Sequence, residues 1–449
     1  MADVIKIKKG IDIRLAGEAA KVYAPASQAK LIGFNPDHFH GMVPKPAVKV
    51  GEPVKIGTVL FYDKNNPDLK VVSPVSGTLQ AVNRGERRKI LSIVVENDFK
   101  ATQETVAAID TSSADALKAS LSNAGFLPFF KQRPYDVVVN PSDTPRAIFV
   151  STFDKAPLAP DMEFILKDEM SDFQAGIDVL SKLAPVYVGI EAGSKLFSHI
   201  KNATVTAFSG SYPMSNVGVQ INHIAPINKG ETVWTITPQE LVFVGRFANK
   251  GKLDFTKTVA FAGPFAANAA YYKVTVGTPV SAICAANISN GVKARVIAGN
   301  VLSGEKTDCD SYLNPFVSLV SVIAEGDETH EMLGWIMPRF DKYSVSGSFL
   351  SGLVPWLRKH KTFDFDTRIL GGARHSIMSG EYDKVFPMDI YPEFLIKAII
   401  AGDIDKMEAL GIYEVVPEDF AAAEFVCSSK MELQKIVREG LDAMRKEMC

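Results

Sequence analysis

A tyrosine and a histidine that follow a buried strand could take part in proton transfer. The stretch from Thr204 to Pro226 begins with small and apolar residues, turns at residues 209–211, and then contains Tyr212 and His223. In an open α/β sheet, ligands bind in the crevice outside the carboxyl ends of the strands. Histidine has a pKa near working pH and can donate a proton to a carbonyl oxygen. We therefore select His223, with Tyr212 beside it, as site candidates. A histidine that bonds only to backbone groups in a loop is the simpler alternative.

The same stretch lacks the glycines of a dinucleotide site. Gly210 and Gly218 are too far apart for the pattern G-x-G-x-x-G. The loop after the first strand of the same α/β region, residues 151–157, contains no glycine, so a pyrophosphate could not approach backbone amides there in the usual way. The sequence thus predicts the position of a nucleotide site without its phosphate-binding residues.

A segment rich in aromatic and cationic residues is the second candidate. Its members are Phe129, Phe130, Lys131, Arg133 and Tyr135. In one interpretation the aromatic rings cap a core while the cations stay in solvent. In the other, the segment is an amphipathic surface for lipid headgroups, a ligand ring or a partner subunit. Residues 349–360, with Trp356 beside basic residues, offer a third such surface or simply core packing.

Metal and iron–sulfur sites are not predicted. His38 and His40 are two residues apart, as two ligands on a strand would be, but no third ligand is near, and a solvated loop explains them better. The four cysteines are far apart and form no C-x-x-C pair, which argues against a zinc ribbon or a conventional iron–sulfur motif. We expect free thiols in a reducing cytoplasm.

Size and composition fit a multidomain globular protein. The chain has 449 residues, of which 47% are hydrophobic and 22% charged, and its formal net charge is −2. This charge gives no reason to expect a nucleic-acid partner. The apolar windows are shorter than the roughly 20 residues that a membrane-spanning helix needs.

The elements that would position these residues alternate in type along the chain. Short strands at 1–35 precede a β-rich part at 36–100, and strand–helix alternation at 101–232 predicts a Rossmann-like parallel sheet. Residues 233–330, including the alternating run WTITPQELVFVGRF, predict a β-grasp-like (SLBB-type) domain. Residues 331–449 are mainly helical, with one helix ending at Gly402 and the last beginning at a capping box, Ser429-x-x-Glu432.

The 36–100 part resembles biotinyl/lipoyl-type barrel-sandwich domains through VKVGEPVKIGTVLF and VVSPVSGTLQAVN. Carrier versions present a lysine in a Met-Lys-Met-like hairpin. The corresponding hairpin here, residues 63–67, has no methionine, so Lys64 and Lys70 are interpreted as surface lysines and the domain as structural.

The order of these parts resembles the A subunits of the Na+-translocating NADH:quinone oxidoreductases. The resemblance covers nearly the whole chain and depends on KIKKGIDI, GSYPMSNVGVQINHIAP, VAFAGPFA, MDIYPEFLIKAIIAGD and EFVCSSK. It implies a peripheral component on the cytoplasmic face of a bacterial membrane complex that oxidises NADH, reduces quinone and exports Na+.

That family is related to the NADH- and flavin-binding subunit of respiratory complex I, which has a glycine-rich flavin run and a cysteine cluster. At the matching places this chain has Ser122–Pro128, with only an Ala-Gly-Phe core and a proline, and Cys427 alone. The resemblance therefore implies that this chain carries no redox cofactor. NADH, flavins and iron centres would belong to partner subunits of the complex. The chain itself would dock chiefly on the membrane subunits.

The function expected from the resemblance is to scaffold, or to help form, the end of the complex that reduces quinone. The seven candidates for a quinone site or a partner surface are His223, Tyr212, Phe129, Phe130, Lys131, Arg133 and Tyr135. The alternatives are a stand-alone α/β protein that binds a small molecule or a flavin nucleotide, and a lipoyl- or biotin-type carrier.

Overall fold

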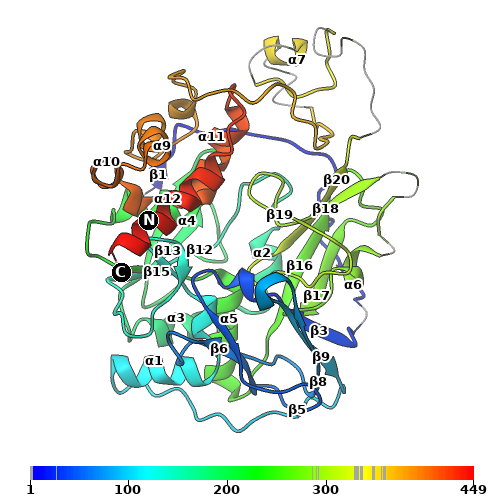
Figure 1. Ribbon diagram of the computed structural model, residues 1–449, viewed down its shortest axis with the longest axis vertical. Helices are drawn as coiled ribbons and strands as arrows, with labels where there is room; N and C mark the ends of the chain where they lie inside the picture. Colours follow the sequence, from blue (N-terminus) through cyan, green and yellow to red (C-terminus); the bar gives the residue numbers. More distant parts are fainter. Residues whose placement is uncertain are drawn as a thin grey trace.

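Four β-sheets and a C-terminal group of helices build the molecule (Figure 1). The computed structural model describes residues 4–26, 28–285, 287–289, 291, 293–327, 333, 337–345, 349–354, 356 and 361–448. Within these residues, no helix combines the length and the apolar character needed to cross a membrane.

The largest sheet has seven strands, and five neighbouring strands in it are parallel. Their order is β1 (Val4–Lys6), β14 (Thr204–Ser209), β13 (Val186–Glu191), β12 (Ala147–Ser151), β15 (Val233–Thr235), β10 (Lys131–Arg133) and β11 (Val137–Val138), the last two being antiparallel. The helices of this part are α1 (Ala114–Asn123), α2 (Met162–Leu166), α3 (Met170–Leu180), α4 (Val217–Ile224) and α5 (Pro238–Lys250), with a 3-10 turn η3 (Leu127–Phe129). The predicted Rossmann-like sheet is confirmed.

The predicted strand character of the run WTITPQELVFVGRF is wrong beyond β15. Residues Pro238–Lys250 form α5, in which every residue from Pro238 to Phe247 is buried. Its four consecutive apolar residues, 241–244, point to all sides of the helix, and such a run does not distinguish a helix from a buried strand. Gly245 lets α5 approach α3 closely, since a Cβ there would lie 1.6 Å from the carbonyl oxygen of Asp172.

The six-stranded sheet forms the β-grasp-like part. Its order is β19 (Glu305–Thr307), β18 (Ala294–Ala298), β20 (Leu319–Ala324), β16 (Thr256–Ala262), β17 (Ala270–Thr275) and β2 (Tyr23–Ala24). A short helix, α6 (Ser281–Cys284), packs against it. The strands β1 and β2, predicted as a separate N-terminal group, are thus divided between two sheets.

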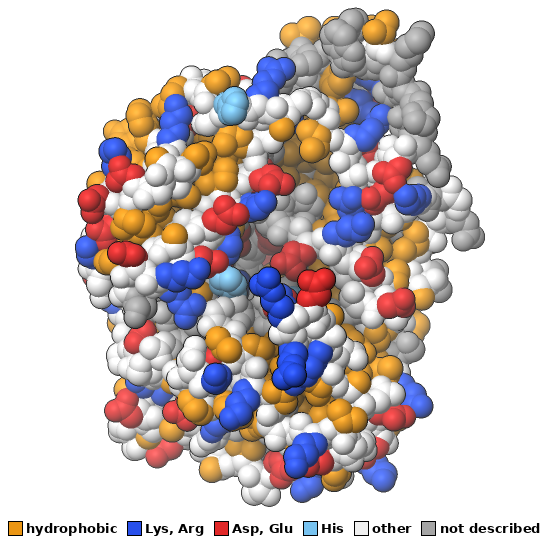
Figure 2. Space-filling model, viewed as in Figure 1, with side chains coloured by type: hydrophobic (Ala, Val, Ile, Leu, Met, Phe, Trp, Pro, Cys, Tyr) orange, Lys and Arg blue, Asp and Glu red, His pale blue; other side chains and the backbone are white. Residues whose placement is uncertain are grey.

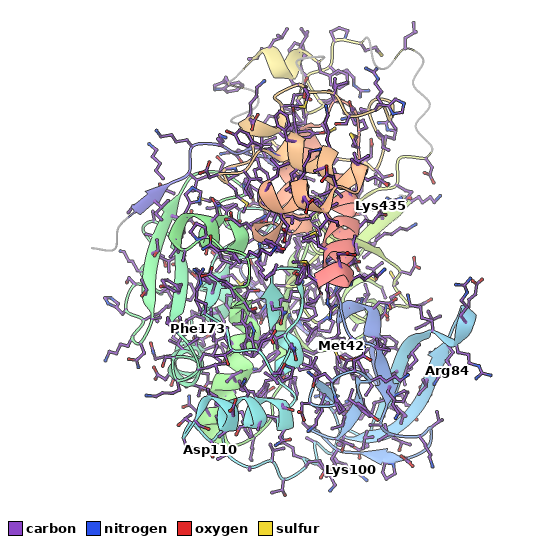
Figure 3. All side chains as sticks on the ribbon, turned by 60° about the vertical axis from the view of Figure 1, so that its left-hand side comes forward. Met42, Arg84, Lys100, Asp110, Phe173 and Lys435 are labelled. Atoms are coloured by element: carbon purple, nitrogen blue, oxygen red, sulfur yellow. The ribbon has the colours of Figure 1, made fainter. Side chains whose placement is uncertain are left out.

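Two small antiparallel sheets make the barrel-sandwich. One contains β3 (Leu31–Phe34), β9 (Ile90–Asn97), β8 (Gly77–Arg84) and β5 (Pro53–Val54); the other contains β4 (Pro44–Pro46), β6 (Val59–Asp63) and β7 (Lys70–Val72). The turns η1 (Pro36–His38) and η2 (Glu86–Arg88) connect strands here. In Figure 3 the labelled Arg84 lies at the tip of this domain, while Lys435 marks the C-terminal helix above it.

The C-terminal part contains short helices. They are α7 (Leu350–Leu353), η4 (Tyr382–Lys384), α9 (Pro392–Ala401), α10 (Ile404–Ala409), η5 (Ile412–Glu414), η6 (Pro417–Phe420), α11 (Ala421–Val426) and α12 (Leu433–Met448). The predicted end of α9 is confirmed, because Gly402 has φ of 67°. The capping box is wrong. Helix α12 begins only at Leu433, and the buried Ser429 hydroxyl has no hydrogen-bond partner among the described residues.

Candidate functional site

The carboxyl edge of the seven-stranded sheet has the topology of a ligand site. The chain passes from β12 to β13 and β14 on one side, and then crosses through α4 to β15 on the other side of β12. Ligands of open α/β sheets bind at such a switch point, outside the carboxyl ends of the strands. Tyr212 and His223 belong to the crossover, as the sequence predicts.

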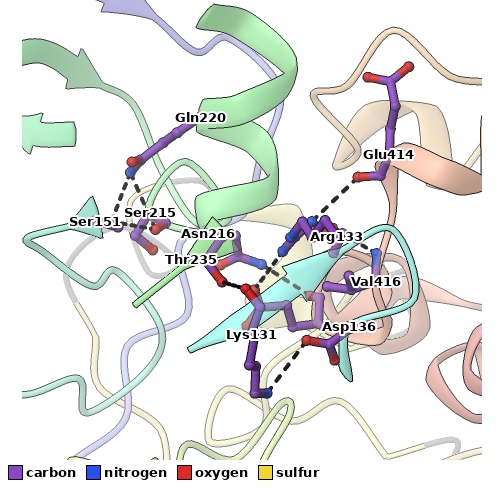
Figure 4. A network of polar contacts seen from close by, with 12 residues as sticks. Lys131, Arg133, Asp136, Ser151, Ser215, Asn216, Gln220, Thr235, Glu414 and Val416 are labelled. Carbon is purple, nitrogen blue, oxygen red and sulfur yellow. Dashed lines mark hydrogen bonds and ion pairs between the residues drawn. The ribbon is translucent and has the colours of Figure 1, made fainter. Parts of the chain in front are cut away.

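Side chains of the protein itself fill this edge between β12 and α4 (Figure 4). The amide of Gln220 donates to Ser151 Oγ at 2.8 Å, and that hydroxyl donates to the carbonyl oxygen of Ser215 at 2.8 Å. The Asp154 carboxylate accepts from the backbone N–H of Ala156 at 2.8 Å. Burial raises the pKa of Asp154. A Cβ on Gly189 would lie only 2.0 Å from Gln220 Oε1, so the amide is packed directly on β13.

Residues of the C-terminal part cover the same edge from outside. Arg133 Nη1 lies 3.1 Å from Asp419 Oδ2, and Arg133 Nη2 lies 3.2 Å from Glu418 Oε1. Asn216 Nδ2, at the start of α4, donates to the carbonyl oxygen of Glu418 at 3.1 Å. The η6 turn is therefore hydrogen-bonded to both β10 and α4.

The pair Arg133–Asp419 is the most deeply buried ion pair of this edge. The side chains are 3% and 0% exposed. Burial alone would lower the pKa of Arg133, but the carboxylates of Asp419 and Glu418 outweigh it and raise the pKa. Partial burial and the neighbouring Asp419 raise the pKa of Glu418 to about 7. Such a network stabilises one docked arrangement only while all its partners are present.

The structure does not bring Tyr212 and His223 together. Tyr212 is buried before α4, where its carbonyl oxygen accepts from the N–H of Ile11 at 2.8 Å, and burial raises the pKa of its phenol. His223 is exposed in the last turn of α4, with Nδ1 2.9 Å from the carbonyl oxygen of Val219. Most of α4, an eight-residue helix roughly 12 Å long, therefore lies between Tyr212 and His223. The segment expected to be a loop up to His223 is helical from Val217.

The aromatic candidates are in the core, so their interpretation as an exposed amphipathic surface is wrong. Phe130 is fully buried against Trp234, Phe129 packs on three other phenylalanines, and Tyr135 packs on Tyr413. Arg133 is buried, and Lys131 is half-buried with Nζ 5.3 Å from the ring centre of Phe316. Three sheets meet around this segment, which is why its aromatic side chains point inward.

The segment Ser122–Pro128 also packs without room for a large ligand. A Cβ on Gly125 would lie 2.5 Å from Val72 Cγ2 of the barrel-sandwich. The apolar cavity at this junction, which Gly125 and Phe129 line, measures about 10 Å³. A space of this size holds one water molecule at most.

Comparison with known proteins decides the family. Three family models match the chain: the NqrA N-terminal barrel-sandwich hybrid domain over residues 5–98, the NqrA second alpha/beta domain over 112–253, and the NQRA C-terminal domain over 258–308. The A subunit of the Na(+)-translocating NADH-quinone reductase of Haemophilus influenzae is 36% identical, with 99% of this chain and 100% of that protein covered. The A subunits of Actinobacillus pleuropneumoniae and Serratia proteamaculans are each 34% identical over the same shares.

The chain belongs to the NqrA family, the A subunits of the Na+-translocating NADH-quinone reductases.

Membership of the NqrA family makes the chain one component of a multi-subunit oxidoreductase that translocates Na+. Among the described residues, no group of three or more His, Cys, Asp or Glu side chains could hold a metal ion. Of the two histidines at positions 38 and 40, His40 has its Nε2 atom 3.0 Å from Asp442 Oδ1 of α12.

A cavity of about 200 Å³ lies beside α5 and β16 of this NqrA-family chain. Carboxylates pair with three of its four cations, Arg246, Lys250 and Lys257, while Lys273 Nζ lies 4.9 Å from the ring centre of Tyr23. Arg246 Nη2 lies 2.7 Å from Glu169 Oε1, and Lys257 Nζ lies 2.6 Å from Glu240 Oε1. The cavity therefore has the polarity of an ion-pair network rather than of a free anion site.

Sequence reasoning missed two features of this member of the NqrA family. Asp419 and Glu418 pair with Arg133 although nearly 290 residues separate them in the sequence. No local sequence pattern predicts that contact. The other feature is the outward side of α9, where Tyr391 is 68% and Phe394 54% exposed. The sequence contains a signal for this exposed surface. Helix α9 is apolar on all sides, which is typical of helices that are buried on all sides.

Proposed function

We propose that this chain is the cytoplasmic docking and scaffold subunit of its complex, and that it attaches to a membrane subunit through the outward side of α9. The observation that carries the proposal is an exposed apolar surface, here called the α9 face. It consists of Ile377, Met378, Tyr391, Phe394 and Ile400.

Hydrogen bonds connect the two segments that carry the α9 face. The Glu393 carboxylate, in the first turn of α9, accepts from the backbone N–H groups of Ser379 at 3.2 Å and Gly380 at 2.8 Å. Ile377 and Met378 therefore lie beside the turn that carries Phe394. Figure 2 shows hydrophobic side chains gathered over this region of the molecule.

An exposed apolar surface of this kind indicates a partner. Large contiguous apolar patches on soluble proteins usually mark interaction sites, and aromatic residues are enriched at the centres of protein interfaces. The relatives are named as subunits of a Na+-translocating enzyme, so a membrane subunit of the same complex is the partner to test first.

The filled carboxyl edge supports a role without a redox cofactor on this chain. A nucleotide or flavin at the switch point would have to displace Gln220, Ser151 and the covering η6 turn. At the position equivalent to the flavin run of the complex I relative, Gly125 is in contact with Val72. We therefore place NADH, flavins and iron centres on partner subunits.

For contact with quinone, His223 is the residue to test. Of the two residues selected first, only His223 is exposed. If quinone or its binding subunit touches this helix, His223→Ala in the intact complex lowers the rate of quinone reduction. An unchanged rate and unchanged inhibitor sensitivity would leave only the scaffold role.

The docking experiment uses the tagged chain expressed with the other subunits and purified from gently solubilised membranes. Tyr391→Asp with Phe394→Asp should abolish co-purification of the membrane subunits, because it places two charges on the apolar contact. The control is Leu91→Asp with Phe99→Asp, which changes two residues of similar exposure on the barrel-sandwich, 47% and 52%. Full co-purification of the Tyr391/Phe394 variant would contradict the proposal.

Two further measurements check the remaining parts. The purified chain alone should show no flavin absorbance. Proteases added to inverted membrane vesicles should cleave the chain, whereas those added to right-side-out vesicles should leave it intact.

A further inference from the structure

Two cysteines share one apolar cluster at one end of the six-stranded sheet. Cys284 is the last residue of α6, and Cys309 follows β19. Cys284 is fully buried, and the half-buried Cys309 packs on the same apolar cluster. The neighbouring Cys309 contributes, after burial, to raising the pKa of the Cys284 thiol.

The main chain holds these cysteines in place. The backbone N–H of Ser281 donates to the carbonyl oxygen of Cys309 at 2.8 Å. The backbone N–H of Val280 donates to the carbonyl oxygen of Ser311, also at 2.8 Å. Cys284 lies three residues after Ser281 in α6, so its side chain returns to the same side of the helix. Backbone hydrogen bonds therefore hold the start of α6 against the segment that carries Cys309.

We propose that Cys284 and Cys309 form a reversible disulfide when the protein meets a hydroperoxide. This oxidation site is independent of the docking role. The resting state in a reducing compartment is the dithiol.

The reaction balances in two steps. The hydroperoxide transfers an oxygen atom to Cys309, which becomes a sulfenic acid, while the peroxide is reduced to water or an alcohol. The sulfur of Cys284 then attacks the Cys309 sulfur, an S–S bond forms, and water leaves. Cys309 reacts first because it is partly exposed, whereas Cys284 is fully buried and shielded from the peroxide.

Cys427 provides an internal control. It is buried like Cys284, but its sulfur lies 3.0 Å from the hydroxyl of Tyr382. Burial without an adjacent thiol should leave it reduced under the same treatment.

The experiment treats the full-length protein, in a Cys449→Ser background, with hydrogen peroxide. Remaining thiols are alkylated with N-ethylmaleimide in denaturant, and peptides are mapped by mass spectrometry without reductant. We expect one cross-linked peptide pair joining Cys284 to Cys309, which dithiothreitol releases, and a higher melting temperature of the oxidised protein. Cys427→Ser should keep both effects, and Cys309→Ser should lose both.

Two outcomes would overturn the proposal. One is an oxygen adduct on Cys309 while Cys284 remains alkylatable. The other is full alkylation of both cysteines at a peroxide concentration that oxidises free glutathione.

Discussion

The C-terminal part of the molecule presents opposite chemistry on its two sides. Towards the seven-stranded sheet, it buries charged groups, with Asp419 and Glu418 paired to Arg133. Towards solvent, it exposes apolar groups, with Tyr391 and Phe394 on the α9 face. Both sides reverse the usual distribution of polar and apolar residues.

Under the proposed function, the difference separates the internal contacts of this chain from its external ones. Buried charges persist only if partners satisfy them, and here the partners come from β10 and η6 of the same chain. The exposed aromatic side chains of the α9 face leave much of their area in water, and the proposed membrane partner would cover them. Substitutions on the two sides should therefore affect different measurements, stability on one side and assembly on the other.

The largest effect is expected at the buried pair. Asp419→Ala leaves the Arg133 guanidinium without its closest carboxylate in a buried position, and we expect the free energy of unfolding to fall by about 3 to 5 kcal/mol. Urea unfolding followed by circular dichroism measures this. The matched control is Glu432→Ala, which removes an exposed pair with Lys435 (3.4 Å, side chains 74% and 66% exposed) and should cost less than about 1 kcal/mol.

Gly218→Ala should destabilise the same contact by about 1 to 3 kcal/mol. A Cβ at Gly218 would lie 2.4 Å from Arg133 Nη1 and 2.5 Å from Asp419 Oδ2, two atoms that their buried pairing holds in place. Alanine is the better helix former by about 1 kcal/mol, so a gain in stability would show that the pair can move. Gly372→Ala, with nothing within 4 Å, is the neutral control.

The raised pKa of Glu418 predicts that the free energy of unfolding depends modestly on pH. Its pKa is raised from 4.5 to about 7, so the folded protein binds this proton more tightly than the unfolded chain does. The corresponding stabilisation is fully present below pH 4.5 and is lost as the pH rises through about 7. Because the side chain is 45% exposed, solvent screens the effect, and we expect less than about 1 kcal/mol. Unfolding curves at several pH values should lose this slope in Glu418→Gln; identical slopes would refute the assignment.

The smallest effect on stability is expected on the α9 face. Phe394→Asp should change the free energy of unfolding by less than about 0.5 kcal/mol, because the ring is 54% exposed and has few contacts to lose. The neighbouring Leu395 is fully buried on the other side of α9. Leu395→Ala should therefore lower the free energy of unfolding by about 2 to 5 kcal/mol. A large loss of stability in Phe394→Asp would mean that the α9 face is part of the fold rather than a contact surface.

The sequence by itself determined the elements whose signals are local. Glycine at 402 ends α9, strand–helix alternation gives the parallel sheet, and apolar spacing gives the buried stripe of α12. The missing glycines at the switch point are likewise visible in the sequence, because phosphate binding depends on residues close together in the chain.

Only the tertiary structure decided what surrounds each candidate. Phe130 and Arg133 have the same sequence pattern whether they face solvent or a core, and their burial depends on sheets that meet from distant parts of the chain. Helix α5 was not distinguishable from a strand because its four consecutive apolar residues, 241–244, point to all its sides. The contact of Arg133 with Asp419 and that of Cys284 with Cys309 were equally invisible, since pairing between distant residues depends on the packing of whole elements rather than on local spacing.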